Sequence, residues 1–86
     1  MLHTILLVDD DLLLLNTTQK ALENKGYTVH IAITGEEAIN QVKAHSHLFA
    51  LVILDHGLPG KNGAETAQEL LKINSDLYIL MYSTSA

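Results

Sequence analysis

Acidic side chains follow two apolar runs of this sequence, at the point where each run ends. Asp9 and Asp10 come directly after the run at residues 4–8, and Asp55 comes directly after the run at residues 51–54. One or two carboxylates, together with water and phosphate oxygens, are the ligands that Mg²⁺ usually takes. A carboxylate beside such a cation can attack a phosphoryl group and form an aspartyl phosphate. These three residues therefore predict a magnesium site at which Asp55 accepts a phosphoryl group.

Parallel strands are the elements that can position these residues, because each acid stands at the end of an apolar run. The four consecutive apolar residues before Asp55 are typical of a strand buried on both faces. The carboxyl ends of parallel strands lie along one edge of a sheet, where ligands bind in open α/β sheets. We therefore expect Asp9, Asp10 and Asp55 to meet at this edge, where a divalent cation would relieve their mutual repulsion. Ser83 follows the apolar run at residues 77–82 and is expected at the same edge.

Four strands and three helices are expected to alternate along the chain, in the order β-α-β-α-β-α-β. The strands are expected over about residues 3–8, 27–32, 51–54 and 77–82. The helices are expected over about residues 11–24, from the N-cap Thr34 to residue 44, and from the N-cap Asn62 to residue 73. Both N-caps have a glutamate three residues later, which is typical of a capping box. This alternation predicts one α/β domain over residues 1–86, with a parallel sheet and right-handed crossovers.

The spacing of apolar residues predicts which side of each helix is buried. In the first helix this face consists of Leu14, Thr18, Ala21 and Leu22. In the third helix it consists of Ala67, Leu70 and Leu71. Asp10 or Asp11 is expected to cap the first helix, and Gly26 is expected to follow its last turn.

Composition and charge narrow the classes of function. The 86 residues include 5 Lys+Arg and 10 Asp+Glu, for a formal net charge of −5. This balance argues against direct nucleic-acid binding, which needs basic side chains to neutralise phosphates. The sequence contains no cysteine, so disulfides and thiolate metal sites are excluded. We find no secretory signal and no apolar run that could span a bilayer, so we expect a cytoplasmic protein without a membrane partner.

Several short motifs occur together at the ends of the expected elements. They are Val8-Asp9-Asp10, Asp55-x-x-x-Pro59-x-x-x-Gly63, Ser83, and Gly35-Glu36-Glu37-Ala38 at the start of the second helix. Their combination resembles the receiver domain of two-component response regulators, and the resemblance covers the whole chain. It implies a flavodoxin-like, doubly wound parallel sheet with strand order 2-1-3-4.

The resemblance also implies a role for each site residue. Asp55 would accept the phosphoryl group from a histidine kinase or a phosphotransfer protein. Asp10 would bind Mg²⁺ directly, Asp9 would act largely through a bound water, and the backbone carbonyl of Gly57 would be a further protein ligand. Ser83 would be the switch hydroxyl that hydrogen-bonds the phosphoryl group. Such a domain assists its own phosphorylation and dephosphorylation without being an enzyme, and the resemblance implies no role for Tyr82.

The chain departs from the family pattern at its C-terminal end. We expect it to lack the fourth helix, the fifth strand and the fifth helix of a receiver, and with them the lysine that the family places after the fifth strand. The strand at residues 77–82 would then be an uncovered apolar edge, and the first helix would lack a helical neighbour on its side of the sheet. We therefore predict impaired phosphorylation and a homo-oligomer that forms through the fourth strand and the first helix. The alternative is that the chain is a fragment of a longer protein whose remainder covers this surface.

Two other classes of function remain as alternatives. A non-phosphorylated, receiver-like module would keep the fold and use its exposed edge for protein interaction or oligomerisation. A hydrolase of the haloacid dehalogenase type has a nucleophile motif that Asp9-x-Asp11 resembles, although Leu13 stands where that family has threonine or valine. Treatment with Mg²⁺ and beryllofluoride or acetyl phosphate would separate the three classes. An adduct is expected on Asp55 for a receiver, on Asp9 for the hydrolase and on neither for the interaction module.

Overall fold

The computed structural model describes residues 3–83, which form four strands and three helices. The strands are β1 (Thr4–Val8), β2 (Thr28–Ala32), β3 (Phe49–Asp55) and β4 (Tyr78–Tyr82). The helices are α1 (Leu12–Asn24), α2 (Gly35–Ala44) and α3 (Gly63–Ile73). The predicted order of elements is confirmed, although β3 begins at Phe49 rather than Leu51 and includes Asp55. None of the helices in this described part of the chain has the length and apolar character needed to cross a membrane.

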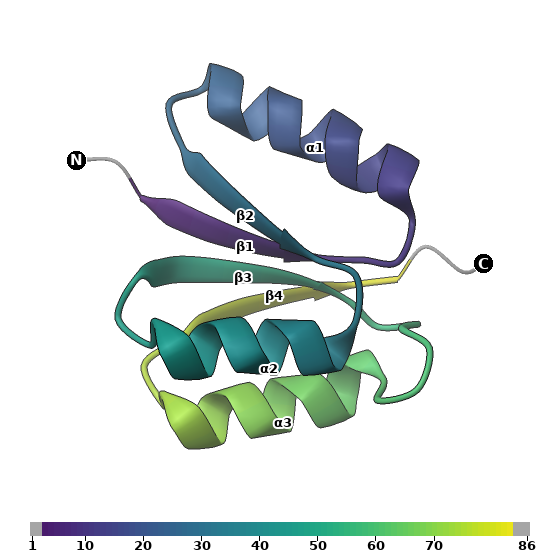
Figure 1. The fold of residues 1–86 in the computed structure, drawn as a ribbon, viewed down its shortest axis with the longest axis vertical. Coiled ribbons are helices and arrows are strands. Elements are labelled where there is room, and N and C mark those ends of the chain that lie inside the picture. The colour runs from purple at the N-terminus through teal and green to yellow at the C-terminus, as the bar shows by residue number, and fades with distance from the viewer. Residues whose placement is uncertain (1–2, 84–86) are drawn as a thin grey trace.

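All four strands pair in parallel, in the order β2-β1-β3-β4 (Figure 1). Parallel neighbours cannot be joined by a tight hairpin, so each of the three helices forms a crossover between consecutive strands. The carboxyl ends of the strands consequently lie along one edge of the sheet, at the right in Figure 1. The predicted doubly wound, flavodoxin-like topology with strand order 2-1-3-4 is thereby confirmed.

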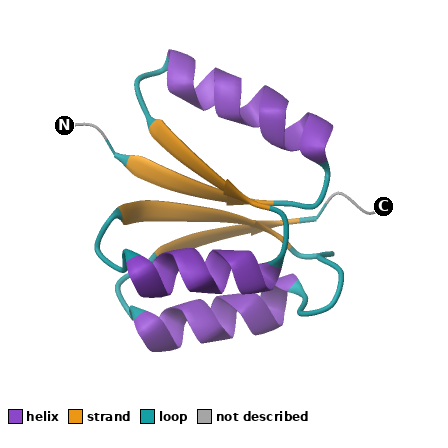
Figure 2. Ribbon diagram, in the orientation of Figure 1, coloured by secondary structure: helices purple, strands orange, loops and turns teal. Residues whose placement is uncertain are grey.

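The helices cover the two faces of the sheet unequally. Helix α1 lies on one face, whereas α2 and α3 lie side by side on the other (Figure 2). The face under α2 and α3 carries the larger apolar cluster, in which Leu6, Val52, Leu54 and Leu70 are fully buried. On the α1 face, Leu51 and Ile53 are only half-buried. The prediction that β3 is buried on both faces is therefore wrong for the face that α1 covers by itself.

Two helices begin with the side-chain hydrogen bonds that the sequence predicts. The Glu65 N–H donates to Asn62 Oδ1 at 2.9 Å, and the Asn62 N–H donates to Glu65 Oε1 at 3.2 Å, which completes a capping box. At α2, the Glu37 N–H donates to Thr34 Oγ1 at 3.0 Å, but the Glu37 carboxylate accepts from the Ile33 N–H instead of the cap's own. An N-cap of this kind stabilises a helix by about 1 kcal/mol. The caps therefore fix where α2 and α3 begin, next to the carboxyl edge of the sheet.

The buried faces of α1 and α3 differ in part from those predicted. Leu15 is the buried residue of α1, while Ala21 is exposed. In α3, Thr66 and Leu70 are fully buried, and Leu71 is 42% exposed. Residues four apart lie on one face of a helix, and the next residue is rotated by about 100°. The position of α3 on the sheet therefore buries the Thr66–Leu70 side and turns Leu71 toward solvent.

Candidate functional site

Strand alternation places two of the predicted acids on the same face of the sheet. Side chains two residues apart in a strand point to the same side. Asp9 follows Leu7 by two residues and Asp55 follows Ile53 by two residues, and both apolar residues belong to the cluster on the α1 face. Since β1 and β3 are neighbours, the two carboxylates meet where these strands end.

Asp10 joins these two residues in a compact acidic cluster. Asp9, Asp10 and Asp55 each offer one carboxylate oxygen, and the three oxygens lie within 4.8 Å of one another. Asp9 and Asp55 are 1% and 3% exposed, whereas Asp10 is exposed. The structure thus brings together the three acids that the sequence placed at this edge. Their hard oxygen donors, two from buried side chains and one from an exposed side chain, suit a divalent cation such as Mg²⁺.

Backbone N–H groups orient both buried carboxylates. The Asp11 N–H donates to Asp9 Oδ1 at 2.9 Å, and the Gly57 N–H donates to Asp55 Oδ1 at 3.2 Å. In each case the donor lies two residues after the acceptor, so the turn that follows the strand fixes the direction of the carboxylate. Gly57 is therefore adjacent to the cluster, and its predicted role as a carbonyl ligand stays a prediction.

Tyr82 is a member of this site that sequence reasoning missed. Its backbone pairs with Asp55 in the β3–β4 ladder, and its hydroxyl donates a hydrogen bond to Asp9 Oδ2. Burial is the largest cause that raises the pKa of Tyr82, followed by the hydrogen bond and the negative charge of Asp9, and then by the charge of Asp55. The phenol consequently keeps its proton and acts as a donor. The available signal was its position two residues after Leu80, which places it on the α1 face.

The remaining predicted residues lie at or beside the same edge. Ser83 directly follows β4 and is exposed, next to Tyr82. Thr84, the hydroxyl residue that follows Ser83 in the sequence, lies outside the described residues. Asp11 accepts hydrogen bonds from the N–H groups of the second and third residues of α1, so it is the N-cap of this helix and is not part of the acidic cluster. This use of Asp11 gives no support to the hydrolase motif.

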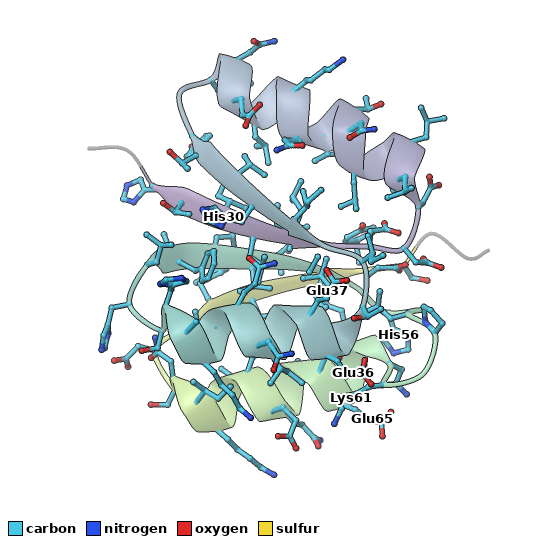
Figure 3. The ribbon with its side chains drawn as sticks, in the orientation of Figure 1. His30, Glu36, Glu37, His56, Lys61 and Glu65 are labelled. Atoms are coloured by element: carbon cyan, nitrogen blue, oxygen red, sulfur yellow. The ribbon has the colours of Figure 1, made fainter. Side chains whose placement is uncertain are left out.

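The loop after Asp55 folds back tightly onto the end of β3. The Gly63 N–H donates to the His56 carbonyl at 3.0 Å. A Cβ atom on Gly63 would lie 2.6 Å from His56 Cα and 2.7 Å from the Asp55 carbonyl oxygen, so glycine is required at this close approach. Figure 3 shows the His56 side chain on this loop and the Lys61 side chain near the first turns of α2 and α3. The start of α3 thereby supports the backbone that carries Asp55.

An apolar groove adjoins the acidic cluster on the α1 face. Its volume is about 250 Å³. It is lined by Leu14, Leu15 and Thr18 of α1 and by Leu7, Ile53, Leu80 and Tyr82 of the sheet. The ring of Tyr82 thus belongs to the groove, while its hydroxyl belongs to the acidic site.

A parallel sheet of this strand order, with two buried carboxylates at its carboxyl edge, defines a doubly wound α/β protein with an acidic cluster that could hold a metal ion. The family model described as response regulator receiver domain matches residues 5–86. The chain belongs to this family.

Relatives and solved structures agree with this assignment. The transcriptional regulatory protein CpxR homolog of Haemophilus influenzae is 37% identical over 71 residues, which are 83% of this chain and 30% of the relative. The aerobic respiration control protein ArcA of Escherichia coli is 42% identical over 66 residues, which are 77% of this chain and 27% of the relative. The chain therefore spans about a third or less of the length of these curated relatives.

Two crystal structures show how closely the fold corresponds. A CheY-like receiver domain protein from Methanospirillum hungatei has a TM-score of 0.91 at 32% identity, and the match covers 100% of this chain and 67% of the other. A chain in the structure of histidine kinase ThkA in complex with response regulator protein TrrA has a TM-score of 0.88 at 33% identity. This match covers 99% of the present chain and 72% of the other. The fold described above is thus the fold of this family.

Proposed function

We propose that residues 1–86 act as one receiver domain in which Asp55 accepts a phosphoryl group from a histidine kinase or a phosphotransfer protein, in a Mg²⁺-dependent reaction. The observation that carries this proposal is the convergence of Asp9, Asp10 and Asp55, with their ligand oxygens within 4.8 Å. Asp55 is 3% exposed, and one of its oxygens is held by the Gly57 N–H. The other oxygen is the candidate nucleophile.

The transfer step needs no redox partner. An Asp55 carboxylate oxygen attacks phosphorus, an oxygen–phosphorus bond forms, and the phosphorus–nitrogen bond to the donor imidazole breaks. The imidazole nitrogen keeps the electron pair of the broken bond and takes up a proton. The chain is consumed stoichiometrically as an acceptor in this step, so it is not an enzyme in its own right.

The residues that would hold the cation are Asp9, Asp10, Asp55 and the Gly57 carbonyl. When bound, Mg²⁺ supplies positive charge that offsets the charge on the phosphoryl oxygens. Ser83 is the proposed switch hydroxyl, because it follows β4 directly at the edge that carries Asp55. A kinase partner is supported by the similarity to the ThkA–TrrA structure, in which a response regulator and a histidine kinase form a complex.

Covalent labelling tests the proposed acceptor. The 86-residue chain is incubated with acetyl phosphate, with and without Mg²⁺, and the modified residue is mapped by mass spectrometry. We expect one phosphoryl group on Asp55, dependent on Mg²⁺, and none on Asp55→Asn. The matched control is Asp76→Asn, because Asp76 is an exposed acid in the turn before β4, outside the cluster. A label on Asp9, or equal labelling of Asp55→Asn and the unchanged chain, would contradict the assignment.

The metal ligands have a separate test. Calorimetric titration with Mg²⁺ should show binding to the unchanged chain and to Asp76→Asn, and weaker binding to Asp10→Asn. Asp10 is the exposed member of the cluster, so this substitution changes the charge of the site without disturbing buried packing. Binding that survives Asp10→Asn unchanged would count against the proposed ligand set.

We also propose that copies of this chain associate through β4 and α1, as an interaction module would. Among the described strands β4 forms an edge, and its residues Tyr78 and Leu80 are 71% and 52% exposed. The β4 sequence Tyr-Ile-Leu-Met-Tyr is nearly the same in both directions, so an antiparallel pair centred on Leu80 sets tyrosine opposite tyrosine. Edge strands without charge or proline favour such pairing. Light scattering should give a mass above that of the monomer, and the substitution Leu80→Lys should lower this mass. A monomer mass for the unchanged chain at micromolar concentration would refute this association.

A further inference from the structure

The Asp9 carboxylate is stabilised in the site by two hydrogen bonds from different elements. Oδ1 accepts from the Asp11 N–H at 2.9 Å, and Oδ2 accepts from the hydroxyl of Tyr82. Asp9 is 1% exposed, so water cannot replace these donors freely. A buried carboxylate that loses a donor is strongly destabilised. The Tyr82 hydroxyl therefore contributes to holding a negative charge next to Asp55 while no cation does so.

The β3–β4 register explains why a tyrosine can reach Asp9. Tyr82 pairs with Asp55, and β4 is separated from β1 by β3. Neighbouring strands lie about 4.8 Å apart, so the hydroxyl has to cross the end of one strand to reach the next. A phenol side chain has this reach, whereas serine or threonine does not. The ring lies along the apolar groove with Ile53 and Leu80, which fixes its direction.

We propose that Tyr82 is a positioning residue of the acidic site, and that a divalent cation binds in competition with its hydrogen bond to Asp9. This inference rests on the proposed Mg²⁺ site. The hydroxyl and the cation both stabilise negative charge on Asp9. The free energy that either partner contributes is therefore smaller when the other is present. Loss of the hydroxyl destabilises the cation-free site and leaves the carboxylate more available to the cation. A residue that merely packs in the groove would have no effect on cation affinity.

The substitution Tyr82→Phe tests this competition, because it keeps the ring in the groove and removes only the hydroxyl. In Mg²⁺ titrations of the 86-residue chain, we expect binding to become about tenfold tighter, the effect of losing one hydrogen bond to a charged acceptor. The matched control is Tyr27→Phe, since Tyr27 directly precedes β2, at the opposite edge of the sheet, and is 37% exposed. It should leave the affinity within about twofold, as expected for an exposed site. Unchanged or weaker binding by Tyr82→Phe would overturn the proposal.

A double-mutant cycle identifies the residue through which Tyr82 acts. In an Asp9→Asn background the carboxylate is absent, so adding Tyr82→Phe should no longer tighten Mg²⁺ binding. Tightening of the same size in both backgrounds would show that Tyr82 acts elsewhere and would refute the pairing with Asp9. The cycle isolates the pairwise contribution because each substitution removes one of the two partners.

Two further readouts separate the failure of this inference from the failure of the proposed function. Urea unfolding in the presence of a chelator should show Tyr82→Phe to be less stable than Tyr27→Phe, whether or not the chain binds Mg²⁺; equal stability would contradict the role of the hydroxyl. Absence of Mg²⁺ binding by the unchanged chain would refute the proposed metal site and, with it, the competition. If Tyr82→Phe does not fold, ring-labelled tyrosine NMR of the unchanged chain decides. Mg²⁺ should then shift the Tyr82 ring signals and leave those of Tyr27 in place, and unmoved Tyr82 signals would overturn the proposal.

Discussion

Replacing Gly63 with alanine perturbs the backbone that carries Asp55. The added Cβ would lie 2.6 Å from His56 Cα and 2.7 Å from the Asp55 carbonyl oxygen, whereas ordinary contacts begin at 3.4 Å. The start of α3 or the end of β3 would have to move by about 0.8 Å to relieve the closer contact. Overpacking of this kind costs about 1–3 kcal/mol, and backbone atoms cannot rotate away as a side chain can. Alanine also lowers the conformational entropy of the unfolded chain, which offsets up to about 1 kcal/mol of this cost. We therefore expect the free energy of unfolding to fall by about 2 kcal/mol.

Urea unfolding monitored by circular dichroism measures this loss, with Gly60→Ala as the control. Gly60 has a φ of +70°, and a Cβ there meets no atom within 4 Å. Alanine at this position therefore lowers stability only because it must adopt the left-handed conformation, which costs about 1–2 kcal/mol. The lower conformational entropy of the unfolded alanine variant offsets part of this cost. Gly63→Ala should be the less stable of the two variants. A Gly63→Ala chain as stable as the unchanged protein would show that the contact with β3 relaxes freely, and the reasoning would be wrong.

Three other predictions concern the α3 cap, the core and the half-buried phenol of Tyr82. Asn62→Ala should lower the free energy of unfolding by about 1 kcal/mol, measured in urea, because the hydrogen bond from the Glu65 N–H to the Asn62 side chain is lost; an unchanged midpoint would contradict this. Leu70→Ala should cost about 2–5 kcal/mol and Leu71→Ala less than about 0.5, since the first is fully buried and the second 42% exposed; equal losses would refute the assigned face. Tyr82 has a raised pKa in the folded chain, so its contribution is complete below the ordinary phenol pKa of about 10 and is lost as pH rises beyond it. Stability should therefore fall above that pH, and Tyr82→Phe should reduce the slope of an alkaline unfolding series.

The fold could be predicted largely from patterns that are local in the sequence. Apolar runs that alternate with capped helical segments predicted the four strands and three helices. The family resemblance predicted the strand order, which the β2-β1-β3-β4 sheet confirms. Burial was less predictable because it depends on how many helices cover each face. Leu51 and Ile53 are as apolar as Val52, yet they are half-buried because α1 by itself covers their side of the sheet.

The acidic site could be predicted in part, because the ends of parallel strands must share an edge. This rule brought Asp9, Asp10 and Asp55 together without any knowledge of distances. Tyr82 could not be found in this way, since its contact with Asp9 depends on the β3–β4 register and on the length of a side chain that crosses one strand. The roles of Gly57 and Ser83 stay predictions until labelling and metal titration are done.

The His56 amide offers a local probe of whether β4 stays attached to the sheet. Its N–H donates to the Tyr82 carbonyl at 2.7 Å, although the His56 side chain is exposed. Hydrogen exchange at this amide therefore requires the last pair of the β3–β4 ladder to open. Because the residue adjoins the proposed acceptor Asp55, its exchange rate would report how the end of the sheet loosens or tightens when the neighbouring carboxylate changes its chemical state.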